Sequence, residues 1–184
     1  SIGGMAKGQL VKEIDALGGE MAKVTDETAI HFRKLNTKKG PAVHSSRTQN
    51  DKNLYHRAMK AVLEQTPNLD VKQARVDALV VEDRRVIGVC DHTGYGFEAP
   101  AVVLATGTFL SGRVYIGETS FEAGRAGEFA SYALAGSLKN LGFTLGRLKT
   151  GTPPRLHRET IDFSKMTRQD SDALAEPFSF FSKG

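Results

Sequence analysis

The sequence predicts an α/β fold in which helices accompany an antiparallel meander and one buried strand. Residues 7–17 and 51–65 repeat apolar side chains at helical spacing. Residues 69–98 contain short β-type runs separated by turns. Val102, Val103 and Leu104 form an apolar run without polar alternation, which is typical of a strand covered on both faces, and we expect a core strand over 101–105.

The first helix expected from the sequence covers residues 7–17. Leu10, Val11 and Ile14 share one of its faces, and Gly18-Gly19 is a typical helix end. A glycine-rich loop precedes it, but neither a Walker A motif nor the dinucleotide fingerprint G-x-G-x-x-G is present there. Such a loop before a helix either binds an anion or simply leads into the helix, and both interpretations stay open.

The next elements are a strand and a second helix. Residues 29–35 alternate, with Ile30 and Phe32 on one side, and predict a strand. No other regular element is predicted between residues 21 and 44. Residues 45–50 are polar and are expected only to lead into the helix at 51–65, which Pro67 terminates.

A meander is expected before the core strand. The first segment, 69–73, is expected to be a short strand lying parallel in a sheet. The segments 76–81, 85–90 and 95–98 are separated by the turns 82–84 and 91–94, which predicts three antiparallel strands.

Glycine loops follow the core strand, which ends in the turn at Thr106-Gly107. Residues 113–118 predict a strand and residues 129–141 a helix, with the loop 124–128 before that helix. In the loop 147–155, Pro153 and Pro154 fix the backbone and remove two donors, so the loop is stiff. Its basic residues suit contacts with phosphate groups. They are Arg147, Lys149 and Arg155.

Composition narrows the class of protein. Hydrophobic residues make up 40% and charged residues 25% of the 184-residue chain, which is ordinary globular composition. No apolar run approaches the roughly 20 residues that span a bilayer. The net charge of +4 permits an anionic partner such as nucleic acid. Cys90 is the single cysteine, and the histidines lack the spacing of metal ligands, so no metal site and no catalytic set is expected.

Several motifs together resemble the GidA/MnmG family of FAD-dependent enzymes that modify the wobble uridine of tRNA. The blocks that carry the resemblance are Ser1-Ile2-Gly3-Gly4, Asp15-Ala16-Leu17-Gly18-Gly19, Lys39-Gly40-Pro41-Ala42-Val43 and the stretch from Arg147 to Arg155. The resemblance implies a glutathione-reductase-type FAD-binding domain. It also implies FAD, NADH and a folate one-carbon donor as cofactors. The implied product carries a carboxymethylaminomethyl or aminomethyl group on C5 of the wobble uridine of tRNA.

The resemblance further implies partners and limits. An MnmE-type GTPase partner, a homodimer, a cytoplasmic location and no membrane association are expected. The family's FAD fingerprint, its cysteines and its C-terminal helical region have no counterpart in this sequence. We therefore expect an internal piece of a longer enzyme that holds no catalytic residue and is inactive alone. Residues 1–107 would be a partial FAD-binding domain, and 108–184 the start of an inserted substrate- and NADH-side domain.

The resemblance assigns site residues position by position. For the cofactor these are Val76, whose backbone would hold the adenine, and Ser131, Ala105, Thr106, Gly107, Gly124, Arg125 and Gly127. For tRNA the weaker candidates are Lys39, Arg47, Arg147, Lys149 and Arg155.

Two other functions stay open. One is a flavin-free, basic RNA-binding α+β module, because no complete cofactor fingerprint is present. The other is a folate- and FAD-dependent tRNA methyltransferase of the same superfamily. The motif blocks from Lys39 to Ala42 and from Arg147 to Pro154 fit the GidA pattern better.

Overall fold

A computed structural model describes residues 1–174 and 176–182 and divides the chain into two compact units. The first unit joins residues 1–71 to 155–184, and the second comprises residues 72–154. Each is described by itself. The domain boundary expected after residue 107 stays a prediction.

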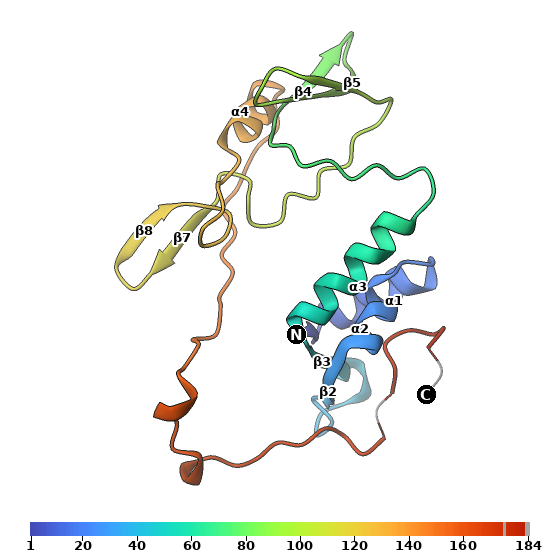
Figure 1. Ribbon diagram of the computed structural model, residues 1–184, viewed down its shortest axis with the longest axis vertical. Coiled ribbons are helices and arrows are strands. Elements are labelled where there is room, and N and C mark those ends of the chain that lie inside the picture. The colour runs from blue at the N-terminus through green and yellow to red at the C-terminus, as the bar shows by residue number, and fades with distance from the viewer. Residues whose placement is uncertain (175, 183–184) are drawn as a thin grey trace. The chain divides into compact units, whose positions relative to one another are not determined.

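The first unit packs three helices with a small antiparallel sheet (Figure 1). The helices are α1 (Lys7–Ala16), α2 (Met21–Thr28) and α3 (Lys52–Gln65). The strands are β1 (Ile2–Gly3), β2 (Ala29–Leu35) and β3 (Ser45–Asn50), in the order β1-β3-β2. Short 3-10 turns lie at Pro41–Val43, Arg158–Thr160 and Phe163–Lys165.

The expected helices and the strand at 29–35 are confirmed, but β3 and α2 were not predicted. β3 is the central strand of its sheet, although its six residues are polar. Its neighbours on both sides satisfy its backbone groups, and Thr48, which is fully buried, donates from Oγ1 to Oδ1 of Asn50 at 2.9 Å. Asn50 in turn donates to the carbonyl oxygen of Thr25 in α2 at 2.7 Å. Pairing of the backbone, rather than alternation of apolar residues, makes this strand.

A C-terminal segment is tied to α1 and α2 by two carboxylates. Asp26 accepts the backbone N–H groups of Phe178 and Ser179 at 2.8 and 2.9 Å. The buried Asp15 accepts the Ser179 hydroxyl at 2.8 Å and the Phe180 N–H at 2.7 Å. These bonds place the fully buried Phe178 ring in the core with Val11 and Ala22.

The second unit contains the predicted meander. Its strands β4 (Val76–Glu82), β5 (Arg85–Asp91) and β6 (Gly96–Glu98) pair antiparallel in sequence order. Helix α4 (Tyr132–Asn140) packs on β4, and the Ser137 hydroxyl accepts the N–H of Leu79 at 3.2 Å. A separate hairpin consists of β7 (Arg113–Ile116) and β8 (Thr119–Glu122), of which only the first strand was predicted.

Two expected strands are wrong. Residues 69–73 form no strand, and Val71 is 65% exposed. Residues 101–105 also form no strand, and Val103 is 90% exposed. A strand requires a neighbour for its backbone groups, and no described strand pairs with either segment. In the apolar run at 102–104, Val103 and Leu104 are exposed and Val102 is half-buried.

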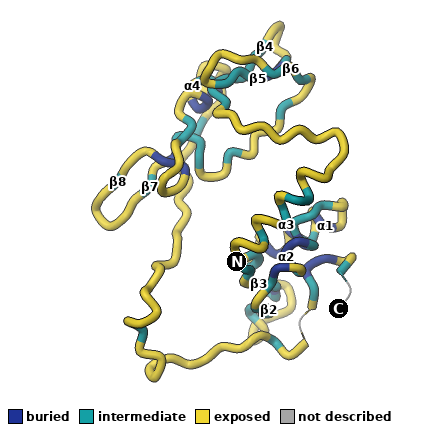
Figure 2. The backbone as a smooth tube through the Cα atoms, viewed as in Figure 1, coloured by how far each residue is buried: buried dark blue, intermediate teal, exposed yellow. Residues whose placement is uncertain are grey.

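Burial is concentrated in a few elements. Figure 2 shows buried positions in α2 of the first unit and in α4 of the second, while most loops are exposed. Leu134, Ala135 and Leu138 form the buried face of α4. This face fixes the helix on β4, and thereby fixes the position of Ser131, which precedes the helix.

Candidate cofactor site

Most of the predicted cofactor residues of the second unit gather around one loop, residues 106–112. Thr106 accepts the N–H of Phe109 at 3.0 Å, which closes a turn over Gly107. Gly107 has φ of +54°, a region that L side chains rarely adopt, and a Cβ added to it would meet no atom within 4 Å. The turn is therefore open, and a ligand can approach its backbone.

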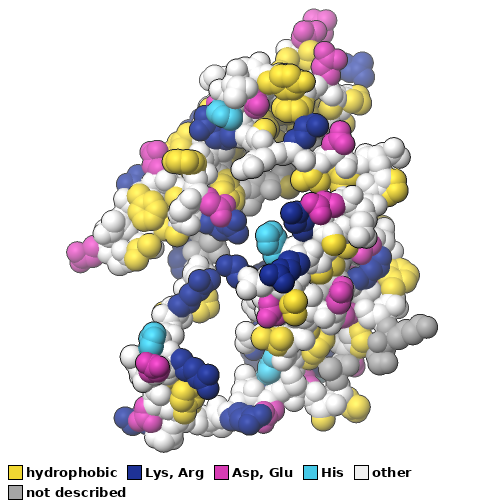
Figure 3. Space-filling model, viewed as in Figure 1, with side chains coloured by type: hydrophobic (Ala, Val, Ile, Leu, Met, Phe, Trp, Pro, Cys, Tyr) yellow, Lys and Arg dark blue, Asp and Glu magenta, His cyan; other side chains and the backbone are white. Residues whose placement is uncertain are grey.

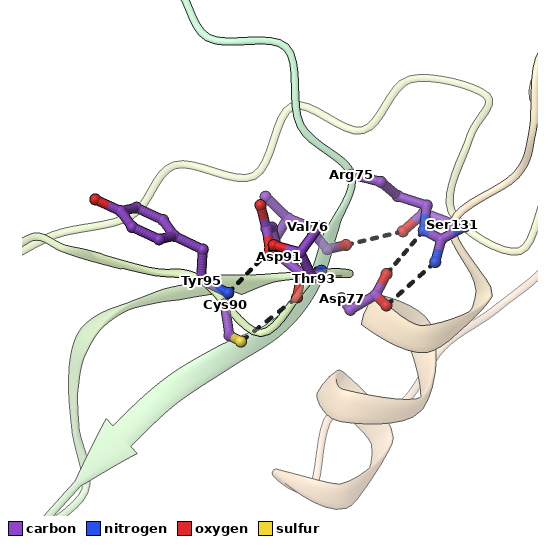
Figure 4. A network of polar contacts seen from close by, with 8 residues as sticks. All are labelled: Arg75, Val76, Asp77, Cys90, Asp91, Thr93, Tyr95 and Ser131. Atoms are coloured by element: carbon purple, nitrogen blue, oxygen red, sulfur yellow. Dashed lines mark hydrogen bonds and ion pairs between the residues drawn. The ribbon is translucent and has the colours of Figure 1, made fainter.

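Ser131 connects this loop to the meander. Its N–H donates to the carbonyl oxygen of Phe109 at 2.8 Å, and its own carbonyl oxygen accepts the N–H of Ser111 at 3.0 Å. Its hydroxyl donates to the carbonyl oxygen of Val76 at 3.2 Å. Ser131 is the N-cap residue of α4, yet its side chain makes no capping bond. The hydroxyl joins α4 to β4 instead (Figure 4).

The surroundings of Val76 are polar and ordered by hydrogen bonds (Figure 4). Arg75 pairs with Asp77 at 3.0 Å, so the two charges on either side of Val76 neutralise each other. Opposite Val76 in the sheet, Asp91 accepts the Thr93 hydroxyl at 2.6 Å. That hydroxyl, followed by backbone N–H groups, lowers the pKa of Asp91 below its ordinary value.

The glycine loop 124–128 packs on the same turn. Gly124 accepts the Thr108 hydroxyl at 2.7 Å, and a Cβ on Gly124 would lie 2.0 Å from Cδ1 of the Phe109 ring. Arg125 pairs with Glu128 and lies 6.0 Å from the centre of the Phe109 ring. Gly127 has φ of +82° within the turn that joins Arg125 to Glu128. A glycine at 124 is thus required by the close approach of Phe109.

The structure adds residues that sequence reasoning missed. Phe109 is the ring on which Gly124 and Arg125 converge, and Tyr132 donates its hydroxyl to the carbonyl oxygen of Gly112 at 3.1 Å. Arg147, predicted for tRNA, donates to the carbonyl oxygen of Ser111 at 2.7 Å and so belongs to this loop. The sequence signal that could have drawn attention to Phe109 is its place two residues after Gly107, but that place does not reveal the contact with Gly124. Tyr132 had no signal beyond its place in a helix.

The other predicted residues do not join this cluster through any contact among the described residues. Ala105 and Lys149 are exposed. Lys39 and Arg47 belong to the first unit, as does Arg155, which is exposed. Figure 3 shows Lys and Arg side chains along the extended segment that Figure 1 draws in orange. The structure therefore supports one compact candidate site, around residues 106–112, which includes Arg147, and leaves the other predicted tRNA residues as separate positions.

Neither a metal site nor a membrane span is indicated. Within residues 1–174 and 176–182, no group of three or more His, Cys, Asp or Glu side chains is placed to hold a metal ion. None of the helices described there has the length and apolarity needed to cross a bilayer.

Comparison with known proteins settles the family. The family model described as "Glucose inhibited division protein A", GIDA, matches residues 1–184. The chain belongs to the GidA family. The family expected from the motif blocks is thereby confirmed.

Relatives and solved structures agree with this. A tRNA uridine 5-carboxymethylaminomethyl modification enzyme MnmG from Syntrophobacter fumaroxidans is 64% identical over 98% of this chain. The enzyme of the same name from Thermodesulfovibrio yellowstonii is 55% identical over the whole chain. Aquifex aeolicus GidA superposes with a TM-score of 0.91 at 47% identity over 99% of this chain. The α/β class is confirmed.

The chain spans less than a third of these proteins. It covers 28% of the Syntrophobacter enzyme, 29% of the Thermodesulfovibrio enzyme and 30% of the Aquifex chain. The activity, substrates and partners of the whole relatives are therefore proposals for this chain.

Proposed function

We propose that this GidA-family chain forms part of the FAD site of an enzyme that modifies the wobble uridine of tRNA. One observation carries the proposal. Val76 and Ser131, the two residues to which the family resemblance assigns FAD contacts, lie 55 positions apart and are joined by a hydrogen bond of 3.2 Å. The relatives' names supply the reaction: they are tRNA uridine 5-carboxymethylaminomethyl modification enzymes.

The residues present fit a flavin dinucleotide. Two guanidinium groups lie near the loop 106–112: Arg125, which is paired with Glu128, and Arg147, whose charge complements the anionic pyrophosphate of FAD. The Gly107 turn leaves its backbone open to a ligand, and the Val76 backbone is fixed by Ser131. When bound, FAD supplies the redox chemistry. This chain's residues hold and orient it.

The wider assignment is also a proposal. We infer that NADH reduces the flavin, that a folate derivative supplies the one-carbon unit, and that an MnmE-type GTPase and a second copy of the enzyme complete the assembly. The chain alone is expected to be inactive, because its sequence holds no G-x-G-x-x-G fingerprint of the kind that the family resemblance implies for FAD. Exposed basic residues such as Lys149 and Arg155 would contact tRNA phosphates, and that affinity would fall as salt rises.

Replacement of Ser131 by alanine tests the flavin assignment. Loss of its hydroxyl frees the Val76 carbonyl and the junction of α4 with β4, so we expect FAD affinity to fall about tenfold, the effect of one or two hydrogen bonds. Quenching of flavin fluorescence during titration of the chain measures it.

Ser137→Ala is the matched control, because its hydroxyl also joins α4 to β4, but through Leu79, which is not a predicted cofactor residue. Equal losses in both variants would mean that only the packing of α4 matters. No FAD binding by the parent chain would favour the flavin-free RNA-binding alternative, and oligonucleotide binding at several salt concentrations would then decide it.

A further inference from the structure

Buried polar atoms without partners gather on one sheet of the first unit, away from the candidate cofactor loop. In the described part of the chain they are Nδ1 of His31, Oγ of Ser45 and Nε of Arg47. The register of β2 and β3 places Arg33 opposite Arg47 and Leu35 opposite Ser45. Opposite residues project from the same face, as do alternate residues of one strand, so all three atoms belong to one face. Such groups in a native protein require a partner, an ion or a water.

The same face holds two arginines directly opposite each other. Side chains in this relation have Cβ atoms about 5 Å apart, and like charges so placed repel. Arg33 donates to the carbonyl oxygen of Asp170 at 3.1 Å, which leaves its charge uncompensated. Among the ion pairs of the described residues, none involves Arg33 or Arg47. A bound anion would offset the repulsion between the two arginines and would supply the missing hydrogen-bond partner.

Three cations, Arg33, Lys34 and Arg47, outnumber the two carboxylates beside them, and of those carboxylates the described ion pairs include only Glu176. Both arginines line a hollow of about 70 Å³, to which Asp172 and Glu176 also contribute. Glu176 pairs with the ammonium group of Lys34 at 3.4 Å, and Asp172 accepts the backbone N–H of Lys34 at 2.6 Å. The hollow exceeds the roughly 15 Å³ that one water needs, so it has room for a small ion.

We propose that Arg33 and Arg47 bind a phosphate-type oxyanion on this face of the β1–β3–β2 sheet. A guanidinium group can offer two nitrogens side by side to two oxygens, and both Arg33 and Arg47 line the hollow. The site lies in the unit that does not contain the 106–112 loop, so it depends neither on flavin nor on the proposed reaction. The phosphate would be a phosphodiester of RNA or a free phosphate group.

Nuclear magnetic resonance of arginine Nε–H groups tests the proposal on the 184-residue chain. Sodium phosphate should shift the Arg47 Nε–H signal saturably, while sodium chloride at equal ionic strength should not. Arg33→Gln should weaken phosphate binding about tenfold or more, because it removes one of two charged donors. Arg57→Gln, on the exposed side of α3, should leave it unchanged. Arg33→Lys serves if the glutamine variant does not fold, since it keeps the charge but loses the planar fork.

The source of the phosphate is separated by a second titration. A five-residue oligouridylate that shifts the same signal at lower concentration than inorganic phosphate identifies an RNA phosphodiester. Response to phosphate without response to the oligomer identifies a free phosphate group. Absence of a saturable phosphate response, an equal response to chloride, or unchanged affinity in both Arg33 variants would overturn the proposal. None of these results bears on FAD binding at the second unit.

Discussion

Phe178→Ala is expected to destabilise the first unit by about 3–5 kcal/mol, the usual cost of truncating a buried phenylalanine. The ring is 0% exposed and packs with Val11 and Ala22, and its Cζ would lie 2.8 Å from a Cβ on Gly3. Because the segment 177–180 is otherwise held by the Asp15 and Asp26 carboxylates, removal of the ring empties the core beneath those bonds. Urea unfolding followed at amide signals of residues 1–71 measures the loss.

Phe163→Ala is the matched control for this prediction. Phe163 is in the same unit but is 59% exposed, so its truncation should change stability by less than about 0.5 kcal/mol. Similar effects of the two substitutions would show that the segment 177–180 does not form the core of the unit.

Gly124→Ala is expected to disrupt the candidate cofactor loop. The added Cβ would lie 2.0 to 2.5 Å from three atoms of the Phe109 ring, so the ring must leave its position. Overpacking of this kind costs about 1–3 kcal/mol. Displacement of Phe109 also disturbs the bonds from its backbone to Thr106 and Ser131, so FAD affinity should fall at least as much as in Ser131→Ala. Thermal unfolding and flavin fluorescence measure the two effects.

Gly136→Ala is the same substitution at a position where we expect it to raise stability instead of lowering it. A Cβ on Gly136 would meet nothing within 4 Å, and the residue lies inside α4, where alanine is favoured by about 1 kcal/mol. FAD affinity should not change. A Gly124→Ala variant that retains full FAD affinity would separate Phe109 from the site.

Local patterns in the sequence predicted much of the meander and the helices. The turns at 82–84 and 91–94 set the pairing of β4, β5 and β6, because neighbouring strands on short turns pair with each other. Helix α3 was recognisable from its apolar spacing, although it begins at Lys52, and Asp51 is its N-cap residue and accepts the N–H groups of Asn53 and Leu54.

Long-range partners explain the failures. β3 consists of polar residues and becomes a strand through its neighbours on either side, which no local pattern contains. The run at 101–105 has strand composition, but no strand among the described residues pairs with it. The segment 177–180 gave no sign that Asp15 and Asp26, more than 150 residues earlier, would hold it.

The candidate site likewise depends on contacts between residues far apart in the sequence, which local patterns do not reveal. Gly107 was assigned to the cofactor through the resemblance to the GidA family, and periodicity did not connect Ser131 with Val76. That pair followed from the resemblance to the GidA family, and the structure places the two residues in contact. The role of Phe109 required the three-dimensional structure, because only there does its ring meet Gly124 and Arg125.

Mapping of FAD binding by amide chemical shifts tests the central claim most directly. We expect saturable shifts at Val76, Ser131, Gly124 and residues 106–112 when FAD is added to the 184-residue chain, with smaller shifts elsewhere. Adenosine diphosphate should reproduce those near Val76, where the adenine is assigned. Saturable shifts confined to other residues, or none at Val76 and Ser131 at millimolar FAD, would contradict the assignment of this loop to the flavin.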